Sequence, residues 1–170
     1  MRKLLALLAL LLGGCVTLPE NVRPVTDFRL ERYLGTWYEI ARLDHSFERG
    51  LSRVSAEYAL REDGGVRVIN RGYSAEEGKW KQAVGKAYFV QDPATGFLKV
   101  SFFGPFYGTY AIFELDHENY RYAVVSGPNT SFVWILAREP FMDEALKKDL
   151  VARAAARGFR TEGLIFVEHD

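Results

Sequence analysis

The chain has 170 residues, with 22 basic and 22 acidic side chains and one cysteine. This length allows one ordinary domain once a leader is removed. A leader that carries Arg2 and Lys3 leaves a slightly acidic remainder, which argues against a nucleic-acid-binding protein because such proteins need a basic face. The single cysteine excludes an internal disulfide, so the stability of the domain must come from its core.

Residues 1–14 are typical of a bacterial secretory leader. Arg2 and Lys3 precede an apolar run over residues 4–12, which is too short for a membrane-spanning helix of about 20 residues. The run ends in Leu-Gly-Gly-Cys, which resembles the bacterial lipobox. Cys15 is therefore predicted to be acylated and to become the first residue of a mature chain that is bound to a membrane.

The residues after the lipobox predict where the protein is anchored and where its domain begins. In lipoproteins of this kind, Val16 in place of an aspartate favours the outer membrane, and the periplasmic face is expected. Residues 15–27 contain Pro19 and Pro24 and little apolar periodicity, so they are expected to form an extended tether. Residues 28–170 are expected to form the folded domain.

Short segments with alternating apolar and polar residues predict eight strands. They cover residues 36–43, 53–61, 66–73, 79–90, 97–103, 106–115, 120–126 and 131–138. Eight strands at short, regular spacing indicate an all-β antiparallel sandwich or barrel. Residues 44–52 interrupt the pattern with charged residues, and a loop of this length is typical of an exposed lid or mouth.

The period of the sequence changes after the last of these strands. Asp143 is expected to be the N-cap and Gly158 the C-cap of one amphipathic helix, whose apolar positions are Met142, Leu146, Leu150 and Ala154. Such a helix would pack its apolar side against the outside of the sheet. Residues 164–167 are predicted to form a short final strand.

The order of the elements, with Gly35-Thr36-Trp37 at the first strand and Arg138 at the end of the eighth, resembles the lipocalin family. The resemblance covers residues 28–167 and is more specific to the bacterial lipocalin lipoproteins, relatives of apolipoprotein D. The stretches that carry it are Tyr33–Leu43, Phe47–Gly50, Val100–Tyr110 and Trp134–Arg138. It implies an eight-stranded up-and-down β-barrel, with one C-terminal α-helix packed outside and a short final strand.

The resemblance also implies roles for individual residues. Trp37 would lie at the closed end of the barrel beneath Arg138, and Gly35, Trp37 and Arg138 would be structural. The second family motif, near the seventh strand, is replaced here by Val-Ser-Gly-Pro at residues 125–128, so receptor docking through that motif is not implied.

Ligand-binding candidates are the residues that strand alternation places inside a barrel. Tyr107 and Trp134 are the strongest candidates because each joins a large apolar surface to a hydrogen-bonding tip. Glu39 and Arg71 could also face inward, toward a ligand headgroup, or be solvated or paired with neighbours. Plain core packing is the alternative for the whole set, which is Leu98, Val100, Phe102, Tyr107, Thr109, Ala111, Phe113, Phe132, Trp134 and Leu136.

The sequence favours a non-catalytic, membrane-anchored carrier that holds a fatty acid, lysophospholipid or similar amphiphile for storage or transport of membrane lipids. The alternatives are an envelope structural or assembly lipoprotein with a packed barrel and, less favoured, a lipid-acting enzyme. There is no Gly-x-Ser-x-Gly motif, and His45, His117 and His169 fall in a loop, a turn and the tail, so neither catalysis nor metal binding is indicated. No cofactor is expected, and a homodimer is left open.

Overall fold

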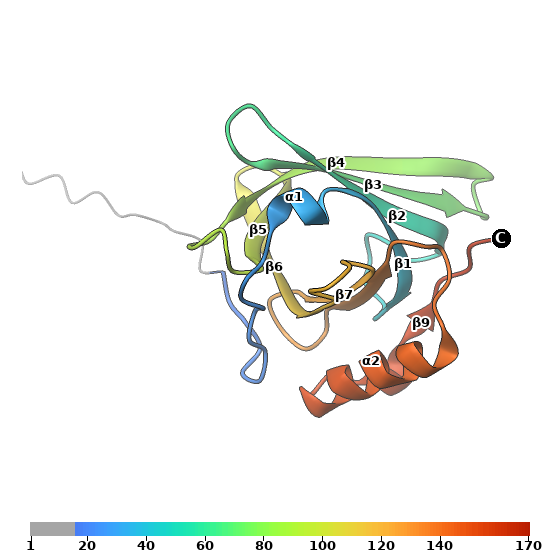
Figure 1. Cartoon of the computed structure of the whole chain (residues 1–170). Coiled ribbons are helices and arrows are strands. Elements are labelled where there is room, and N and C mark those ends of the chain that lie inside the picture. Colours follow the sequence, from blue (N-terminus) through green and yellow to red (C-terminus); the bar gives the residue numbers. More distant parts are fainter. Residues whose placement is uncertain (1–15) are drawn as a thin grey trace, which may run out of the picture.

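The structure, a computed structural model, describes residues 16–170 and contains one antiparallel sheet that closes into a barrel (Figure 1). Its strands are β1 (Gly35–Arg42), β2 (Leu51–Leu60), β3 (Val66–Ser74), β4 (Lys79–Phe89), β5 (Phe97–Phe103), β6 (Phe106–Leu115), β7 (Tyr122–Ser126) and β8 (Val133–Ala137). Each strand pairs with the next, and β1 also pairs with β8. The predicted eight-stranded up-and-down barrel is therefore confirmed.

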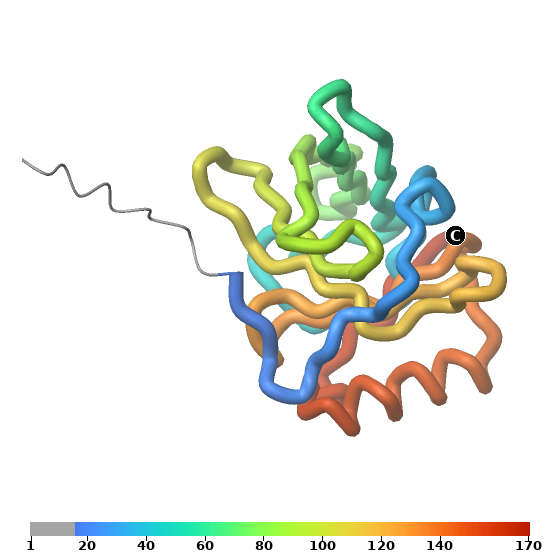
Figure 2. Tube along the Cα trace, turned by 60° about the vertical axis from the view of Figure 1, so that its left-hand side comes forward, coloured from blue at the N-terminus to red at the C-terminus, as the bar shows by residue number. Residues whose placement is uncertain are grey.

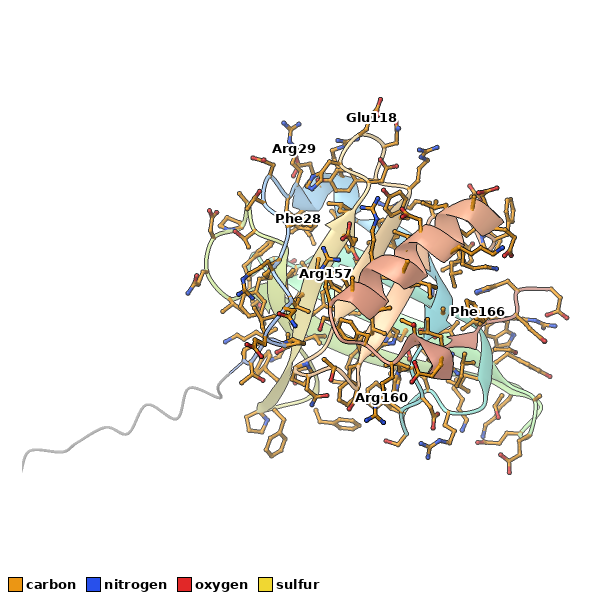
Figure 3. The ribbon with its side chains drawn as sticks, turned by 90° about the horizontal axis from the view of Figure 1, so that it is seen from below. Phe28, Arg29, Glu118, Arg157, Arg160 and Phe166 are labelled. Carbon is orange, nitrogen blue, oxygen red and sulfur yellow. The ribbon has the colours of Figure 1, made fainter. Side chains whose placement is uncertain are left out.

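The helix and the final strand lie on the outside of the barrel wall. Helix α2 (Glu144–Ala156) begins where the Asp143 carboxylate accepts hydrogen bonds from the backbone N–H groups of Ala145 and Leu146. Its buried side packs on the barrel, and strand β9 (Ile165–Phe166) then pairs with β1, as the sequence predicts. Figure 3 shows α2 lying across the outside of the barrel wall, with Phe166 on the segment that follows it. Among residues 16–170, no helix is both long and apolar enough to cross a membrane.

The up-and-down topology gives the barrel two different ends. The short helix α1 (Leu30–Tyr33) covers one end, where β1 starts and β8 stops, and we call this the closed end. Four connections meet at the opposite end, which we call the open end: residues 43–50, 75–78, 104–105 and 127–132. In Figure 3 the closed end is uppermost, with Phe28, Arg29 and Glu118 near it, and Arg160 lies toward the open end.

The segment before α1 differs from the expected extended tether. Val22 is fully buried, and the Val25 N–H donates to the Ile112 carbonyl at 2.8 Å, so the segment packs along the outside of the barrel. Figure 2 shows this blue segment running along the barrel from the open end toward α1. It adds hydrogen bonds and apolar contacts to the barrel wall. The predicted leader and Cys15 lie outside the described residues.

Two apolar cores result, one on each side of the barrel wall. The inner core fills the barrel and includes Trp37, Tyr58 and Leu98. The outer core lies between the wall and α2 and includes Phe113, Ile135 and Leu150. Several strands are therefore apolar on both faces, which weakens the period-2 signal that tells the inner face from the outer one.

Candidate functional site

The floor of the barrel is built by Trp37 and Arg138, as the resemblance implies. Trp37 is completely buried and donates from Nε1 to the Tyr33 carbonyl at 2.8 Å. The Arg138 guanidinium lies 4.0 Å from the centre of the Trp37 ring, and it donates hydrogen bonds to the carbonyls of Arg32, Thr36 and Tyr120. Gly35 has a φ of +95°, a conformation that side chains rarely adopt. These contacts seal the closed end against water.

Three tyrosines form a hydrogen-bonded group inside the barrel above this floor. The Tyr110 hydroxyl lies 2.7 Å from that of Tyr33 and 2.8 Å from that of Tyr58. Burial raises the pKa of all three phenols, so they are neutral at physiological pH. Sequence reasoning missed this group because it placed the other face of β6 inside.

The interior around these tyrosines is apolar and closely filled. A small cavity there is lined by residues that include Phe28, Val68, Leu98 and Val100. It has room for about one water molecule. The Phe102 ring fills the space beside Gly85 on β4, since a Cβ on Gly85 would stand 2.8 Å from that ring.

The interior is more open toward the open end. Gly108 pairs directly with Val100, so it lies on the same inner face, and it is exposed. No heavy atom lies within 4 Å of the place where a Cβ on Gly108 would stand. The barrel is therefore packed near its floor and open along this part of its wall.

A buried ionic cluster lies near the open end of the barrel, whose entrance we call the mouth. Arg42 donates to the Glu39 carboxylate at 2.7 Å and to the Glu48 carbonyl at 2.9 Å. The Glu48 carboxylate accepts from Trp134 Nε1 at 3.1 Å and lies 2.7 Å from His45 Nε2. The exposed fraction of Arg42 is 1% and those of the two glutamates are 4% and 8%, so the charges are almost fully removed from water.

A β-bulge brings Arg42 into this cluster. Simple alternation from Trp37 would put Arg42 on the outer face, but the register shifts between Glu39 and Ala41. After the shift Arg42 pairs with Trp134, and both side chains face inward. Sequence alternation could not show this extra residue.

The electrostatics of the cluster differ between its two carboxylates. Burial, with the nearby negative charge of Glu48, raises the pKa of Glu39 well above its usual value despite the Arg42 ion pair. Burial also acts to raise the pKa of Glu48, but the hydrogen bond and charge of His45 outweigh it and hold that pKa below its usual value. Among the described residues, Arg42 Nε and His45 Nδ1 have no hydrogen-bond partner. These two nitrogen atoms could therefore form hydrogen bonds with a ligand headgroup.

The structure places five of the ten predicted ligand-binding residues on the inner face. Leu98 and Leu136 are buried in the inner core, and Val100, Phe102 and Trp134 pack against it. Phe132 lies at the open end, where its ring stacks on that of Trp134 with 6.2 Å between centroids. Their role in binding stays a prediction.

The predicted inward direction of Tyr107, Thr109, Ala111 and Phe113 is wrong. Leu98 pairs with Tyr110, so Tyr110, Gly108 and Ile112 are the inner residues of β6 and the predicted set lies on the outer face. Phe113 stacks on Phe159 beneath α2, and the Thr109 hydroxyl donates to the Thr17 carbonyl. A register that is off by one residue reverses every side chain of a strand.

The remaining charged and histidine candidates are also placed by the structure. Arg71 lies on the outer face, where it pairs with Glu57 at 3.0 Å. Glu39 is both inward and paired. The loop 43–50, expected to be exposed, in fact buries His45 against Glu48, and the His-x-x-Glu spacing is the one signal that could have predicted this. Within residues 16–170, no three His, Cys, Asp or Glu side chains are grouped so that they could hold a metal ion.

Comparisons with known proteins agree with this geometry. A family model described as a lipocalin-like domain matches residues 28–169. The chain is 58% identical to the outer membrane lipoprotein Blc of Vibrio cholerae, over 98% of this chain and 97% of that protein. It is 51% identical to the protein of the same name from Escherichia coli K12, over 89% of this chain and 85% of that one. Insecticyanin from the tobacco hornworm has a similar fold, with a TM-score of 0.72, 21% identity, and coverage of 92% and 88%.

The chain therefore belongs to the lipocalin family. Within it, the chain falls with the outer membrane lipoproteins, which confirms the localisation expected from its leader. It is a binding protein for small hydrophobic ligands and not an enzyme.

Proposed function

We propose that this protein is a membrane-anchored carrier that holds a fatty acid or lysophospholipid in its barrel, for storage or transport of membrane lipids. The observation that carries the proposal is the division of the interior into an apolar part near the floor and an ionic cluster near the mouth. A fatty acid or lysophospholipid is divided in the same way, into an apolar chain and a polar headgroup. Its acyl chain would lie against Leu98 and Val100, and its headgroup would meet Arg42 and His45.

The energetics of an acyl chain suit such a site. Each buried methylene contributes about 0.8 kcal/mol, so a long chain gains a large favourable term from leaving water. The lost freedom of the ligand and the desolvation of its headgroup offset much of this gain. Arg42 Nε and His45 Nδ1 would supply hydrogen bonds to a carboxylate or phosphate and reduce that desolvation cost.

Entry of a whole acyl chain requires the mouth to rearrange. The cavity has room for about one water molecule, which is far less than a lipid tail needs. Glu48 holds the loop 43–50 to the barrel at the open end, through its contacts with Arg42 on β1 and Trp134 on β8. We infer that this loop is displaced outward, and that Phe102 changes rotamer, when a lipid enters.

The test is binding of lipid to delipidated protein. Titration with oleate or a lysophospholipid is expected to change the fluorescence of Trp134 saturably, and the Trp134→Phe variant, which keeps Trp37 and Trp80, should lose most of that change. Gly108→Phe is expected to block binding because its ring would enter the open part of the interior. Tyr107→Ala is the matched control, since Tyr107 lies on the outer face, and it should bind as the parent does.

The alternative of a structural or assembly lipoprotein with a packed barrel is favoured by one observation, the small volume of the cavity. It predicts no saturable titration and no lipid in the purified protein by mass spectrometry. That pair of results would reject the carrier.

A further inference from the structure

The open end carries large apolar side chains that project into solvent. Phe103 and Phe106, on either side of the β5–β6 turn, are 81% and 77% exposed, and Phe47 in the loop 43–50 is 66% exposed. Leaving a phenylalanine side chain in water forgoes the free energy of its burial. Phenylalanines gathered at one end of a molecule, rather than scattered singly, mark a surface that meets an apolar partner. We call Phe47, Phe103 and Phe106 the aromatic rim.

The turn that carries two of these residues stands clear of the rest of the protein. A Cβ placed on Gly104, at the tip of the turn, would meet no heavy atom within 4 Å. Phe103 and Phe106 face each other across the ends of β5 and β6 and thus form one apolar tip. Phe47 is instead supported from behind by the His45 ring, with 4.0 Å between centroids. The aromatic rim is therefore carried by two strand ends and by a loop, and not by a chain terminus.

The chain enters the domain at this same end. The Thr17 carbonyl accepts from the Thr109 hydroxyl at 2.6 Å, and the Thr17 hydroxyl donates to the Pro128 carbonyl at 3.2 Å. Pro128 belongs to the β7–β8 connection at the open end, and Figure 2 shows the start of the described chain beside that connection. Cys15 is two residues before Thr17, and two residues span at most about 7 Å. Acyl chains on Cys15 would therefore enter a bilayer next to the open end.

We propose that the open end of the barrel rests on the surface of the phospholipid bilayer, with the aromatic rim inserted among the lipid headgroups and upper acyl chains. The short connection from Cys15 to Thr17 selects this end, because the closed end lies a full barrel length away. Aromatic side chains are favoured at such interfaces, where their rings leave water. In this orientation the mouth opens onto the membrane, so a lipid could pass between bilayer and barrel without crossing bulk water.

The membrane anchor and the passage of lipid in this inference rest on the proposed function. The docking of the open end on the bilayer rests separately on the exposure of the aromatic rim. The first experiment uses the acylated protein in vesicles of phosphatidylethanolamine and phosphatidylglycerol. Because Cys15 is the only cysteine and its thiol is blocked by acylation, Phe103→Cys and Phe141→Cys each introduce one thiol for a fluorescent label. Phe141 is 74% exposed but follows β8 at the closed end, which makes it a matched control.

Brominated phospholipids are expected to quench the label at position 103 several times more strongly than the label at position 141. Equal quenching at the two positions, or none at position 103, would overturn the proposal.

The second experiment removes the anchor, so that only the rim can hold the protein on the vesicle. In a chain that begins at Val16, and so lacks both the apolar leader and Cys15, the double change Phe103→Ser and Phe106→Ser is expected to weaken partition onto the same vesicles about tenfold, because two rings no longer leave water. Phe141→Ser should leave partition unchanged. Partition of the rim variant equal to that of its parent would overturn the docking.

Lipid titration in solution separates the two proposals. The rim variant should still bind oleate in its barrel, since Phe103 and Phe106 lie outside the binding site. Docking that persists in a protein that binds no lipid in solution would support the docking and reject the carrier.

Discussion

The two ends of the barrel are built from different interactions. At the closed end, Trp37 is buried beneath Arg138, and the arginine binds backbone carbonyls, which cannot titrate. At the open end, Arg42 pairs with the Glu39 carboxylate and donates to the Glu48 carbonyl, and the pKa values of these two glutamates are shifted in opposite directions. The floor is therefore fixed by packing at every pH, whereas the mouth depends on charges that a ligand, a proton or a mutation can change.

The same contrast appears at the surface. Residues of the floor are covered by α1, and Tyr33 at its end is 2% exposed. The three phenylalanines of the aromatic rim are more than half exposed, and the chain enters beside them. A sealed end and an apolar, exposed end suit a container that is loaded from one side. Four experiments test this difference.

The largest effect is expected from Trp37→Ala at the floor. Removal of a fully buried indole leaves a cavity, so the free energy of unfolding should fall by about 3–5 kcal/mol, measured by urea denaturation. Phe141→Ala, at an exposed position, should change it by less than about 0.5 kcal/mol. A Trp37→Ala variant as stable as its parent would show that the floor is not the stable end.

Arg42→Ala should be the most damaging change at the mouth. It leaves Glu39 and Glu48 buried without their arginine, and breaking a buried ion pair in this way costs about 3 kcal/mol. Replacing both partners, Arg42→Met with Glu39→Met, should recover most of that loss because no buried carboxyl group without its partner remains at position 39. If the double variant is less stable than Arg42→Ala, the loss comes from packing and not from charge.

The mouth should also make stability depend on pH through Glu39. Above its ordinary pKa of 4.5 the unfolded chain loses this proton while the folded protein keeps it, so stability falls as pH rises, by at most about 1.4 kcal/mol per pH unit, until the raised pKa is passed. Glu39→Gln should remove this decline in urea unfolding measured across pH.

Glu48→Gln is the control for the Glu39 measurement. The pKa of Glu48 is lowered, so its stabilising contribution is present above its ordinary pKa of 4.5 and is lost as pH falls through the lowered value. Glu48→Gln should therefore change how the free energy of unfolding depends on pH below its ordinary pKa of 4.5, and not above it. An unchanged slope in Glu39→Gln would mean that Glu39 does not hold its proton in the folded state.

The smallest effect is expected from Trp134→Phe, which removes one donor from Glu48. A single hydrogen bond of this kind contributes about 1 kcal/mol to stability. Because that bond also holds the loop 43–50, lipid association measured by stopped flow with a fluorescent fatty acid should become faster. Slower association would show that the loop does not limit access to the barrel.

Much of the fold follows from local sequence. Turn residues and alternation predict the number and order of strands, and Asp143 and the apolar positions before Gly158 predict α2. The floor was implied by the resemblance to the lipocalin family, through Gly35 and Trp37 in one short motif and Arg138 at a strand end. Such signals depend on backbone conformation and on side-chain periodicity, which neighbouring residues largely determine.

The binding face of β6 could not be predicted in the same way. Tyr107 and Tyr110 are both large and partly polar, and the outer face of β6 is as apolar as the inner one because α2 and the N-terminal segment cover it. Alternation then favours neither register, and the choice depends on the pairing with β5. The same pairing turns Gly108 inward and so shapes the open part of the interior.

The sequence by itself therefore determined the container, with eight strands in order and one outer helix, and its resemblance to the lipocalin family implied the tryptophan–arginine floor; the lipoprotein leader stays a prediction. Only the tertiary structure decided which residues face the interior, that His45 and Glu48 fold into the mouth, and that the chain enters beside the aromatic rim. The reason is physical. Strands and turns form from neighbouring residues, whereas register, a bulge and a buried ion pair depend on groups brought together by closure of the barrel.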